Sequence, residues 1–267
     1  MRRSSYIFFA EGGETLIKLE NVSVRLGKKT VLDSFSASFE RGKISAVIGR
    51  NGCGKTTMLR AVSNFLKFDG KIELDSKDVK DYSREELAKR LAFMPQRVPS
   101  PHVRVRELVA FGRSPHLNHF GYLSENDKAT VMQTLNECDC LSLADKYADE
   151  LSGGELRKVF FAMMLCTDAD VLLLDEPTAN LDAVHKRMLL DLLKDLCEKK
   201  SKTVVVVLHD VNEAFDVAHN IVCMDTGKCV FSGNVNEIRQ SGVIEELLCL
   251  KPYTVIGENN NKRVFYK

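Results

Sequence analysis

The residue types most suited to chemistry lie in a run from Gly49 to Thr56, which matches the pattern G-x-x-x-x-G-K-[ST]. Glycines let successive backbone N–H groups turn inward around phosphate groups, and a helix that follows adds the positive end of its dipole. Lys55 supplies a mobile positive charge, and the Thr56 hydroxyl can ligate Mg²⁺. The run therefore predicts a site for ATP or GTP, formed by Gly49, Arg50, Asn51, Gly52, Cys53, Gly54, Lys55, Thr56 and Thr57.

The sequence on both sides of this run supplies the elements that a phosphate loop requires. Ile44 to Ile48 is short, apolar and β-branched, which predicts a buried strand, and helical spacing follows from Thr57 through Val62. A chance match on a glycine-rich turn would not bring this context with it. Within the loop, we expect the backbone of Cys53, rather than its sulfur, to face the nucleotide.

A second reactive pair, Asp175 and Glu176, directly follows an apolar strand predicted over Val171 to Leu174. Ligands of open α/β sheets bind at the carboxyl ends of such strands. Asp175 suits the Mg²⁺ role of a phosphate-loop ATPase, and Glu176 suits a base that orients and deprotonates the attacking water. The alternative is a pair of solvated carboxylates, but the phosphate loop upstream favours the catalytic interpretation.

The order of the predicted elements indicates an α/β fold. Alternation of apolar and polar residues predicts antiparallel strands over Leu16 to Val24 and Ser34 to Glu40, which form a β lobe. Continuous apolar runs at 171–174 and Val204 to Leu208 predict parallel strands that are covered on both faces. The crossover helix between them, over Asp182 to Glu198, has an apolar side predicted to pack in the core: Met188, Leu189, Leu192, Leu193 and Leu196.

Composition is that of an ordinary globular protein. The 267 residues are 44% hydrophobic and carry a formal net charge of +1, so no global field favours nucleic acid or an anionic membrane. The eight cysteines form no metal-binding pattern, and free thiols are expected. No apolar run approaches the length of a membrane span, so a membrane role would require a partner.

One further motif identifies a family. Leu151 to Glu155, which reads Leu-Ser-Gly-Gly-Glu, resembles the signature sequence of ABC ATPases. The resemblance, which covers roughly Leu16 to Ile238, implies that Gln96 senses the Mg²⁺ and the water, and that His209 is the switch histidine. It also implies that Asn180 to Asp182 is the D-loop.

The same resemblance implies a site shared between two chains. In the family, the signature segment faces the γ-phosphate held by the opposite subunit, so two copies sandwich two ATP molecules head to tail. The residues that would contact the partner's nucleotide are Ser152, Gly153, Gly154, Glu155 and Asp182. A plain helix cap explains Ser-Gly-Gly equally well by itself, but not its coincidence with the other motifs.

The clearest departure from the family concerns the adenine. An aromatic residue usually stacks on the base from a loop after the first strand, and Leu26, 23 residues before Gly49, occupies that position here. Leucine offers apolar contact but no π-face. We therefore expect the phosphate groups to provide most of the nucleotide affinity.

The residue pattern and the resemblance together predict how the chain is divided. We expect a phosphate-loop NTPase core with an antiparallel β lobe over 16–240, and a helical lobe inserted at about 97–152. Residues 1–15 are predicted to form a flexible tail, and 241–267 an extension packed on the core.

Three substrings narrow the subfamily: Asn51 to Lys55, Gly112 to His116, and Leu208 to Ala214. Together they resemble the ATPase subunits of bacterial iron-siderophore, haem and cobalamin importers. The implied partners are a second copy, a transmembrane permease that docks on Pro99 to Pro115, and indirectly a substrate-binding protein, at the cytoplasmic side of the membrane. A stand-alone ABC ATPase of iron–sulfur cluster assembly remains the alternative.

Overall fold

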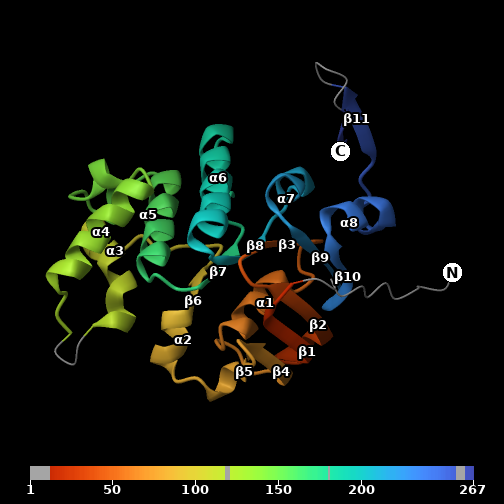
Figure 1. The fold of residues 1–267 in the computed structure, drawn as a ribbon, viewed down its shortest axis with the longest axis horizontal. Coiled ribbons are helices and arrows are strands. Elements are labelled where there is room, and N and C mark those ends of the chain that lie inside the picture. Colours follow the sequence, from red (N-terminus) through yellow and green to blue (C-terminus); the bar gives the residue numbers. More distant parts are fainter. Residues whose placement is uncertain (1–12, 118–120, 180, 257–261) are drawn as a thin grey trace.

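The computed structural model describes residues 13–117, 121–179, 181–256 and 262–267 (Figure 1). The tail predicted over 1–15 lies largely outside this part of the chain. The first strand already begins at Thr15, and the carbonyl of Glu14 accepts a hydrogen bond from the Arg41 backbone. The β lobe therefore starts slightly earlier than predicted.

The β lobe is a four-stranded antiparallel sheet in the order β2-β1-β4-β5. On β2 the residues Phe35, Ala37 and Phe39 are buried, as their alternation with polar residues predicts. The strands are β1 (Thr15–Leu26), β2 (Lys29–Glu40), β4 (Asp69–Leu74) and β5 (Lys77–Asp78).

The central sheet has six strands in the order β10-β9-β3-β8-β7-β6, all parallel except the edge strand β10. A hairpin turn at Thr226 and Gly227 joins β9 to β10, and both residues have positive φ, as a tight two-residue turn requires. The strands are β3 (Ile44–Gly49), β6 (Leu91–Met94), β7 (Val171–Asp175), β8 (Thr203–Val207), β9 (Asn220–Asp225) and β10 (Lys228–Asn234).

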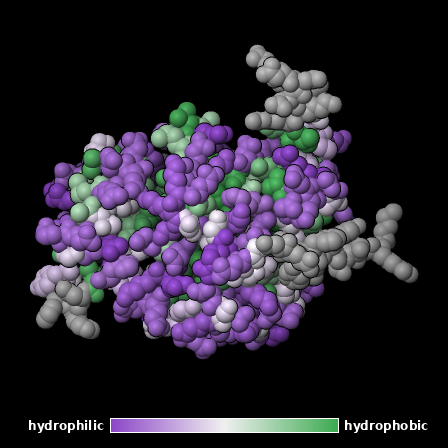
Figure 2. Space-filling view, viewed as in Figure 1, coloured by the Kyte–Doolittle hydropathy of each residue, from purple (hydrophilic) through white to green (hydrophobic). Residues whose placement is uncertain are grey.

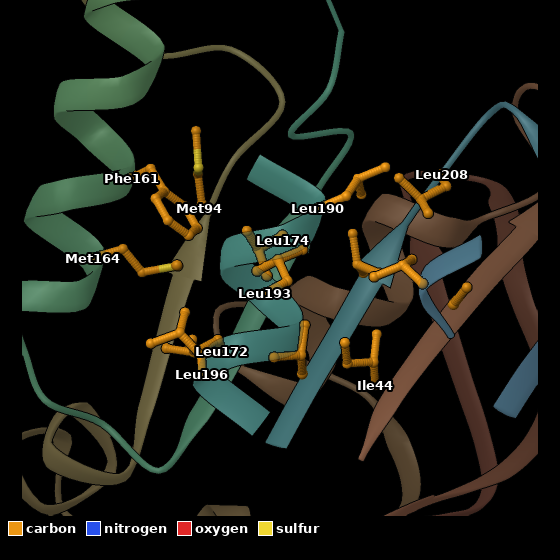
Figure 3. Packing of buried hydrophobic residues seen from close by; sticks show 14 of the residues in the cluster. Ile44, Met94, Phe161, Met164, Leu172, Leu174, Leu190, Leu193, Leu196 and Leu208 are labelled. Carbon is orange, nitrogen blue, oxygen red and sulfur yellow. The ribbon is translucent and has the colours of Figure 1, made fainter. Parts of the chain in front are cut away.

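The central sheet is covered on both faces. Leu172 and Leu174 of β7 face the core shared with α5 and α6, while Val171 and Leu173 face the core shared with α1 and the β lobe. Figure 3 shows the first of these cores, in which side chains from α5 and α6 converge on the strands. The continuous apolar runs of these strands follow from this double burial.

The helices divide into those that cover the sheet and those of a separate lobe (Figure 1). In the lobe, α5 packs against both α3 and α4, so the helical layer continues past residue 152 to Cys166. The α-helices are α1 (Lys55–Val62), α2 (Arg84–Arg90), α3 (Val105–Ala110), α4 (Glu125–Glu137), α5 (Gly153–Cys166), α6 (Ala183–Lys200), α7 (Val211–Val217), α8 (Val235–Ser241) and α9 (Val243–Leu248). Short 3₁₀ turns cover Val79–Asp81, Phe111–His116, Leu141–Leu143 and Ala148–Glu150.

The C-terminal segment continues directly from the core. The boundary predicted at residue 240 falls inside α8, and Ile244 and Leu247 of α9 are buried in the main core. After α9, β11 (Pro252–Ile256) and β12 (Lys262–Tyr266) form a two-stranded sheet, and the Tyr266 ring packs against Phe215 of α7.

The prediction for α6 was wrong at one residue. Met188 is 48% exposed, whereas the buried side chains of this helix are Leu190, Leu193, Leu196 and Cys197. The buried face is therefore centred closer to Leu193 than predicted.

The face of the molecule in Figure 2 is mostly hydrophilic with small hydrophobic areas, and none of the described helices is long and apolar enough to cross a membrane.

The eight cysteines all lie in the described part of the chain, and all are free, as predicted. Burial raises the pKa of Cys138, Cys197 and Cys229 to about 12, so these thiols stay protonated at neutral pH. Burial also raises the pKa of Cys53, and the nearby positive charge of Lys55 opposes this shift.

The motif from Gly112 to His116 contacts two helices of the helical lobe, α4 and α5. A side chain at Gly112 would place its Cβ 2.2 Å from the carbonyl oxygen of Met163. The buried Arg113 donates from Nε to Asp127 Oδ1 at 2.8 Å and from Nη1 to the Cys166 carbonyl at 3.0 Å. The motif thus anchors the end of α5 to the start of α4.

Asp127→Asn should lower the free energy of unfolding by about 2 kcal/mol at pH 7. Hydrogen bonds from Ser124 and Arg113 lower the pKa of Asp127 from 3.8 to about 2. Because the folded-state pKa is depressed, this stabilisation is complete above the unfolded pKa and is lost as the pH falls through the folded value. Urea unfolding of both proteins at pH 7, 5 and 3 should show a difference that is constant between pH 7 and 5 and smaller at pH 3. A difference that does not change with pH would contradict this explanation.

Candidate nucleotide-binding site

The predicted site residues lie at the carboxyl ends of neighbouring strands. In the sheet, β3, β8, β7 and β6 are consecutive neighbours. Their ends lead in turn into the phosphate loop, His209, the pair at 175–176, and Gln96. Parallel pairing of these strands therefore brings together residues that are far apart in the sequence.

The phosphate loop leaves β3 at Gly49 and enters α1 at Lys55. Gly54 has a φ of 111°, and a Cβ at Gly49 would lie 2.2 Å from the carbonyl oxygen of Met224 on β9. Lys55 is buried, and its Nζ donates to the carbonyls of Gly49 at 2.8 Å and Arg50 at 3.1 Å. The lysine therefore lies across the loop, with its charge directed into the concave backbone.

The carboxylate of Glu176 is held from both sides. The amide Nε2 of Gln96 donates to Glu176 Oε2 at 2.6 Å, and His209 Nε2 lies 2.5 Å from Glu176 Oε1. The Glu176 side chain is only 12% exposed, whereas His209 is 45% exposed. The structure thus brings together the three residues predicted to be catalytic.

Asp175 is fully buried next to this group, and neither of its carboxylate oxygens has a hydrogen-bond partner among the described residues. Burial raises the pKa of this carboxyl, an effect that the neighbouring Thr56 hydroxyl partly offsets. A bound cation would stabilise the ionised form of this buried carboxyl. Since Asp175, Thr56 and Gln96 all offer oxygen atoms, the donor set fits a hard cation such as Mg²⁺.

The backbone of Glu176 is in an unusual conformation. Its φ is 52°, in the left-handed region that costs a non-glycine residue about 1–3 kcal/mol, and the residue before a proline normally adopts an extended conformation. The Glu176 N–H donates to the Val207 carbonyl on β8 at 3.2 Å. Its own carbonyl accepts a hydrogen bond of 2.6 Å from Nη2 of Arg157 on α5.

Arg157 was missed by the sequence interpretation. It is 7% exposed, and it also donates to the carbonyls of Gln96 at 3.0 Å and Ala179 at 3.3 Å. A signal was present, since Arg157 stands four residues before Phe161 and seven before Met164, both core residues. Helical spacing therefore placed its charged side chain on the buried face of α5.

Ser152 caps the helix that follows the signature sequence. Its Oγ accepts a hydrogen bond from the Glu155 N–H at 3.3 Å, and the Glu155 carboxylate accepts one from the Ser152 N–H at 2.9 Å. This capping interaction lowers the pKa of the Glu155 carboxyl. Gly153 and Gly154 form the first turn of α5, so the helix cap is present, and the role of this segment toward a partner's nucleotide stays a prediction.

A cavity of about 540 Å³ separates the signature sequence from the loop after β7. Among the described residues, none that lines this cavity belongs to the phosphate loop of the same chain. The lining includes Ser152, Gly154, Glu155, Leu181 and Asp182. Asp182 caps α6 by accepting from the His185 N–H, while Asn180 lies outside the described residues.

Leu26 ends β1 next to a two-residue turn and is 48% exposed. Its neighbour across the hairpin is Lys29. The arrangement leaves an apolar side chain at the surface, consistent with its predicted position beside a nucleotide base. Its role in holding adenine stays a prediction.

The comparisons with known proteins agree with this geometry. The sequence profile of the family described as ABC transporter matches residues 32–179, more than half of the chain. The chain belongs to this family. This ABC ATPase uses ATP hydrolysis to drive transport. The family and the fold class predicted from the sequence are thus confirmed, whereas the roles of individual site residues stay predictions.

Relatives and solved structures match this ABC ATPase over most of its length. The petrobactin import ATP-binding protein YclP of Bacillus subtilis (strain 168) is 36% identical over 87% of this chain and 92% of its own. An inward-facing ABC transporter assigned to the metal-chelate type is 26% identical, with a TM-score of 0.81 over 95% of this chain and 97% of its own. A dimeric post-hydrolysis state of the ATP-binding cassette MJ0796, bound to ADP and Pi, is 26% identical, with a TM-score of 0.73 over 82% of this chain and 99% of its own.

Proposed function

We propose that this chain is the ATP-hydrolysing subunit of a membrane importer for iron–siderophore complexes, with haem and cobalamin as the other substrates of that class. The observation that carries the ATPase role is the carboxylate of Glu176, held between Gln96 and His209 beside the phosphate loop. The substrate class is supported by the similarity to a petrobactin import protein and to a transporter assigned to the metal-chelate type.

We infer that Thr56, Asp175 and Gln96 hold a Mg²⁺ ion in the working site. The partnerless oxygens of the buried Asp175 support this assignment, and the amide oxygen of Gln96 is left over after its nitrogen has bound Glu176. When bound, the ion neutralises charge on the phosphate oxygens. The cation also compensates the cost of keeping Asp175 ionised in a buried position.

The chain's own residues then account for the hydrolysis step. The phosphate-loop N–H groups and Lys55 hold the β- and γ-phosphates. A water oxygen attacks the γ-phosphorus, the bond from that phosphorus to the bridging β-γ oxygen breaks, and Glu176 accepts the proton of the water. His209 and Gln96 orient the carboxylate, each of whose oxygens has a lone pair left for the water.

We infer that two copies form the complete site. Among the described residues that line the cavity beside Ser152, none belongs to the phosphate loop of the same chain, which supports completion of that site by a second chain. The dimeric state of the MJ0796 cassette is a precedent in the same fold. In such a dimer, Ser152 and the N–H groups of the α5 start would face the γ-phosphate bound by the partner.

A permease is the second proposed partner, at the cytoplasmic side of the membrane, and the segment from Pro99 to Pro115 is its proposed docking surface. This segment carries Arg104 and Arg106, which contact the carbonyl and the carboxylate of Asp145, respectively. Arg106 is exposed on the outside of the helical lobe, where a partner can reach it, whereas Arg104 is half-buried against the Tyr147 ring. A substrate-binding protein would act only through the permease.

Loss of this chain should remove uptake of one substrate class. In cells that lack the gene, accumulation of ⁵⁵Fe from a ferric siderophore should fall at least tenfold, and the wild-type gene should restore it, because import without hydrolysis has no energy source. Haem and labelled cobalamin, assayed in parallel, decide among the three substrates. Unchanged uptake of all three, together with loss of iron–sulfur enzyme activity, would contradict the importer and favour the alternative of cluster assembly.

A further inference from the structure

Arg157 lies where two functional loops meet the helix that follows the signature sequence. It stands on α5, five residues after Ser152, and its guanidinium donates to carbonyls of residues that follow β6 and β7. These carbonyls belong to Gln96, Glu176 and Ala179. The side chain is buried, and its Nε has no partner among the described residues, so every hydrogen bond it makes is to one of these loops.

Of the three hydrogen bonds that Arg157 donates, the one to the Glu176 carbonyl is the shortest, and the backbone of Glu176 is strained. At φ 52° and directly before Pro177, the Glu176 backbone occupies a conformation that its own sequence disfavours. Such a conformation persists only where the surroundings over-determine it. Here the N–H is fixed by Val207 of the sheet, and the carbonyl is fixed by Arg157 of the helical lobe.

We propose that Arg157 is a positioning residue for ATP hydrolysis: it holds the strained Glu176 backbone, so that the carboxylate stays between Gln96 and His209. The proposal rests on the assignment of Glu176 as the base. Because the same guanidinium also binds the Gln96 carbonyl, it fixes the base and one of the residues that orient it relative to each other. It further makes the geometry of the base depend on α5, the helix that begins at the signature serine.

Arg157→Met keeps an unbranched side chain on the buried face and removes all three hydrogen bonds. We expect kcat for ATP hydrolysis to fall by roughly 30- to 100-fold, as for a small misplacement of a catalytic group. The dissociation constant of ATP should change less than about twofold, since no contact to the phosphate loop is lost. Arg157→Lys, which can reach only one or two of the carbonyls, should be intermediate.

Asp127→Asn is the control for stability. Asp127 is also a buried charged residue, and it pairs with Arg113, but it lies on α4, outside the nucleotide site and outside the proposed docking segment. It should lower the melting temperature about as much as Arg157→Lys while leaving kcat within about twofold of wild type. An equal loss of kcat in both variants would show that Arg157 acts only through stability and would overturn the proposal.

A double-mutant cycle tests whether Arg157 acts through Glu176. In single-turnover assays, Glu176→Gln and the double variant with Arg157→Met should hydrolyse ATP at rates within about twofold of each other. If the double variant were slower than Glu176→Gln by the full factor that Arg157→Met causes in the wild-type background, the proposed role of Arg157 would be overturned. A hydrolysis rate of Arg157→Met close to that of wild type would also overturn it. Wild-type turnover of Glu176→Gln alone would instead overturn the proposed base, so the two failures are distinguishable.

Discussion

Glu176→Gln is expected to lower kcat for ATP hydrolysis by about 10²- to 10⁴-fold, the usual contribution of a positioned general base. The amide is isosteric and can still bond to Gln96 and His209, but it cannot accept a proton from water. ATP affinity should change less than about twofold, because the phosphate loop is untouched. Phosphate release in the steady state and calorimetric titration with ATP measure the two quantities separately.

The same variant should accumulate as an ATP-bound dimer. If hydrolysis opens the sandwich, a protein that binds Mg²⁺-ATP and does not hydrolyse it stays closed, and light scattering should show a dimer that wild type shows only transiently. Glu137→Gln is the matched control, because Glu137 is also held by a glutamine amide and by a nitrogen of a second side chain, Gln133 and Lys200, but on α4. Unchanged ATPase rates in Glu176→Gln would remove this residue from the role of base.

The sequence predicted those parts of the site that local patterns encode. The phosphate loop follows from glycine spacing between a strand and a helix, and the carboxylates of Asp175 and Glu176 follow from their place after a continuous apolar strand. The apolar runs of β7 and β8 are too short for helices and suit strands that are buried on both faces, so both strands were predicted nearly to the residue.

Contacts between segments that are far apart in the chain could not be predicted from the sequence. Arg157 donates hydrogen bonds to backbone carbonyls of two separate loops. Because every residue has a backbone carbonyl, no pattern of side chains in the sequence predicts such contacts. Arg50 is a similar case: the sequence placed it in the phosphate loop. The structure shows that its Nε donates to the Leu247 carbonyl of α9 at 2.7 Å.

The C-terminal segment contacts the site on a second side as well. The side-chain amide of Asn212, three residues after His209, pairs with the backbone of Tyr266, donating to its carbonyl at 3.2 Å and accepting from its N–H at 2.9 Å. Together with Arg50, this links both the phosphate loop and the helix after the switch histidine to residues 247–266. The pattern of apolar and polar residues predicts that such a segment packs on the core, but it does not predict which loop the segment contacts.

Mixing two inactive variants should restore hydrolysis if the sites are shared between chains. Lys55→Ala removes the phosphate contact, and Ser152→Arg places a bulky cation where the partner's γ-phosphate would lie, so each protein alone should be at least tenfold less active than wild type. In a mixed dimer, the Lys55 of one chain and the Ser152 of the other form one intact site, while the second site carries both defects. About half of the dimers in an equal mixture are mixed, so roughly a quarter of wild-type activity should return if the sites act independently.

A second mixture provides the control. Lys55→Ala combined with the double variant Lys55→Ala/Ser152→Arg contains no intact Lys55 in either chain, so it should remain inactive at every ratio. The dependence on total protein concentration is the decisive measurement: because each site needs two chains, the specific ATPase rate of wild type should rise with concentration until the dimer is saturated. A strict monomer that hydrolyses ATP at a specific rate independent of its own concentration would contradict the shared site, since Lys55 and Glu176 would then suffice without the Ser152 of a partner.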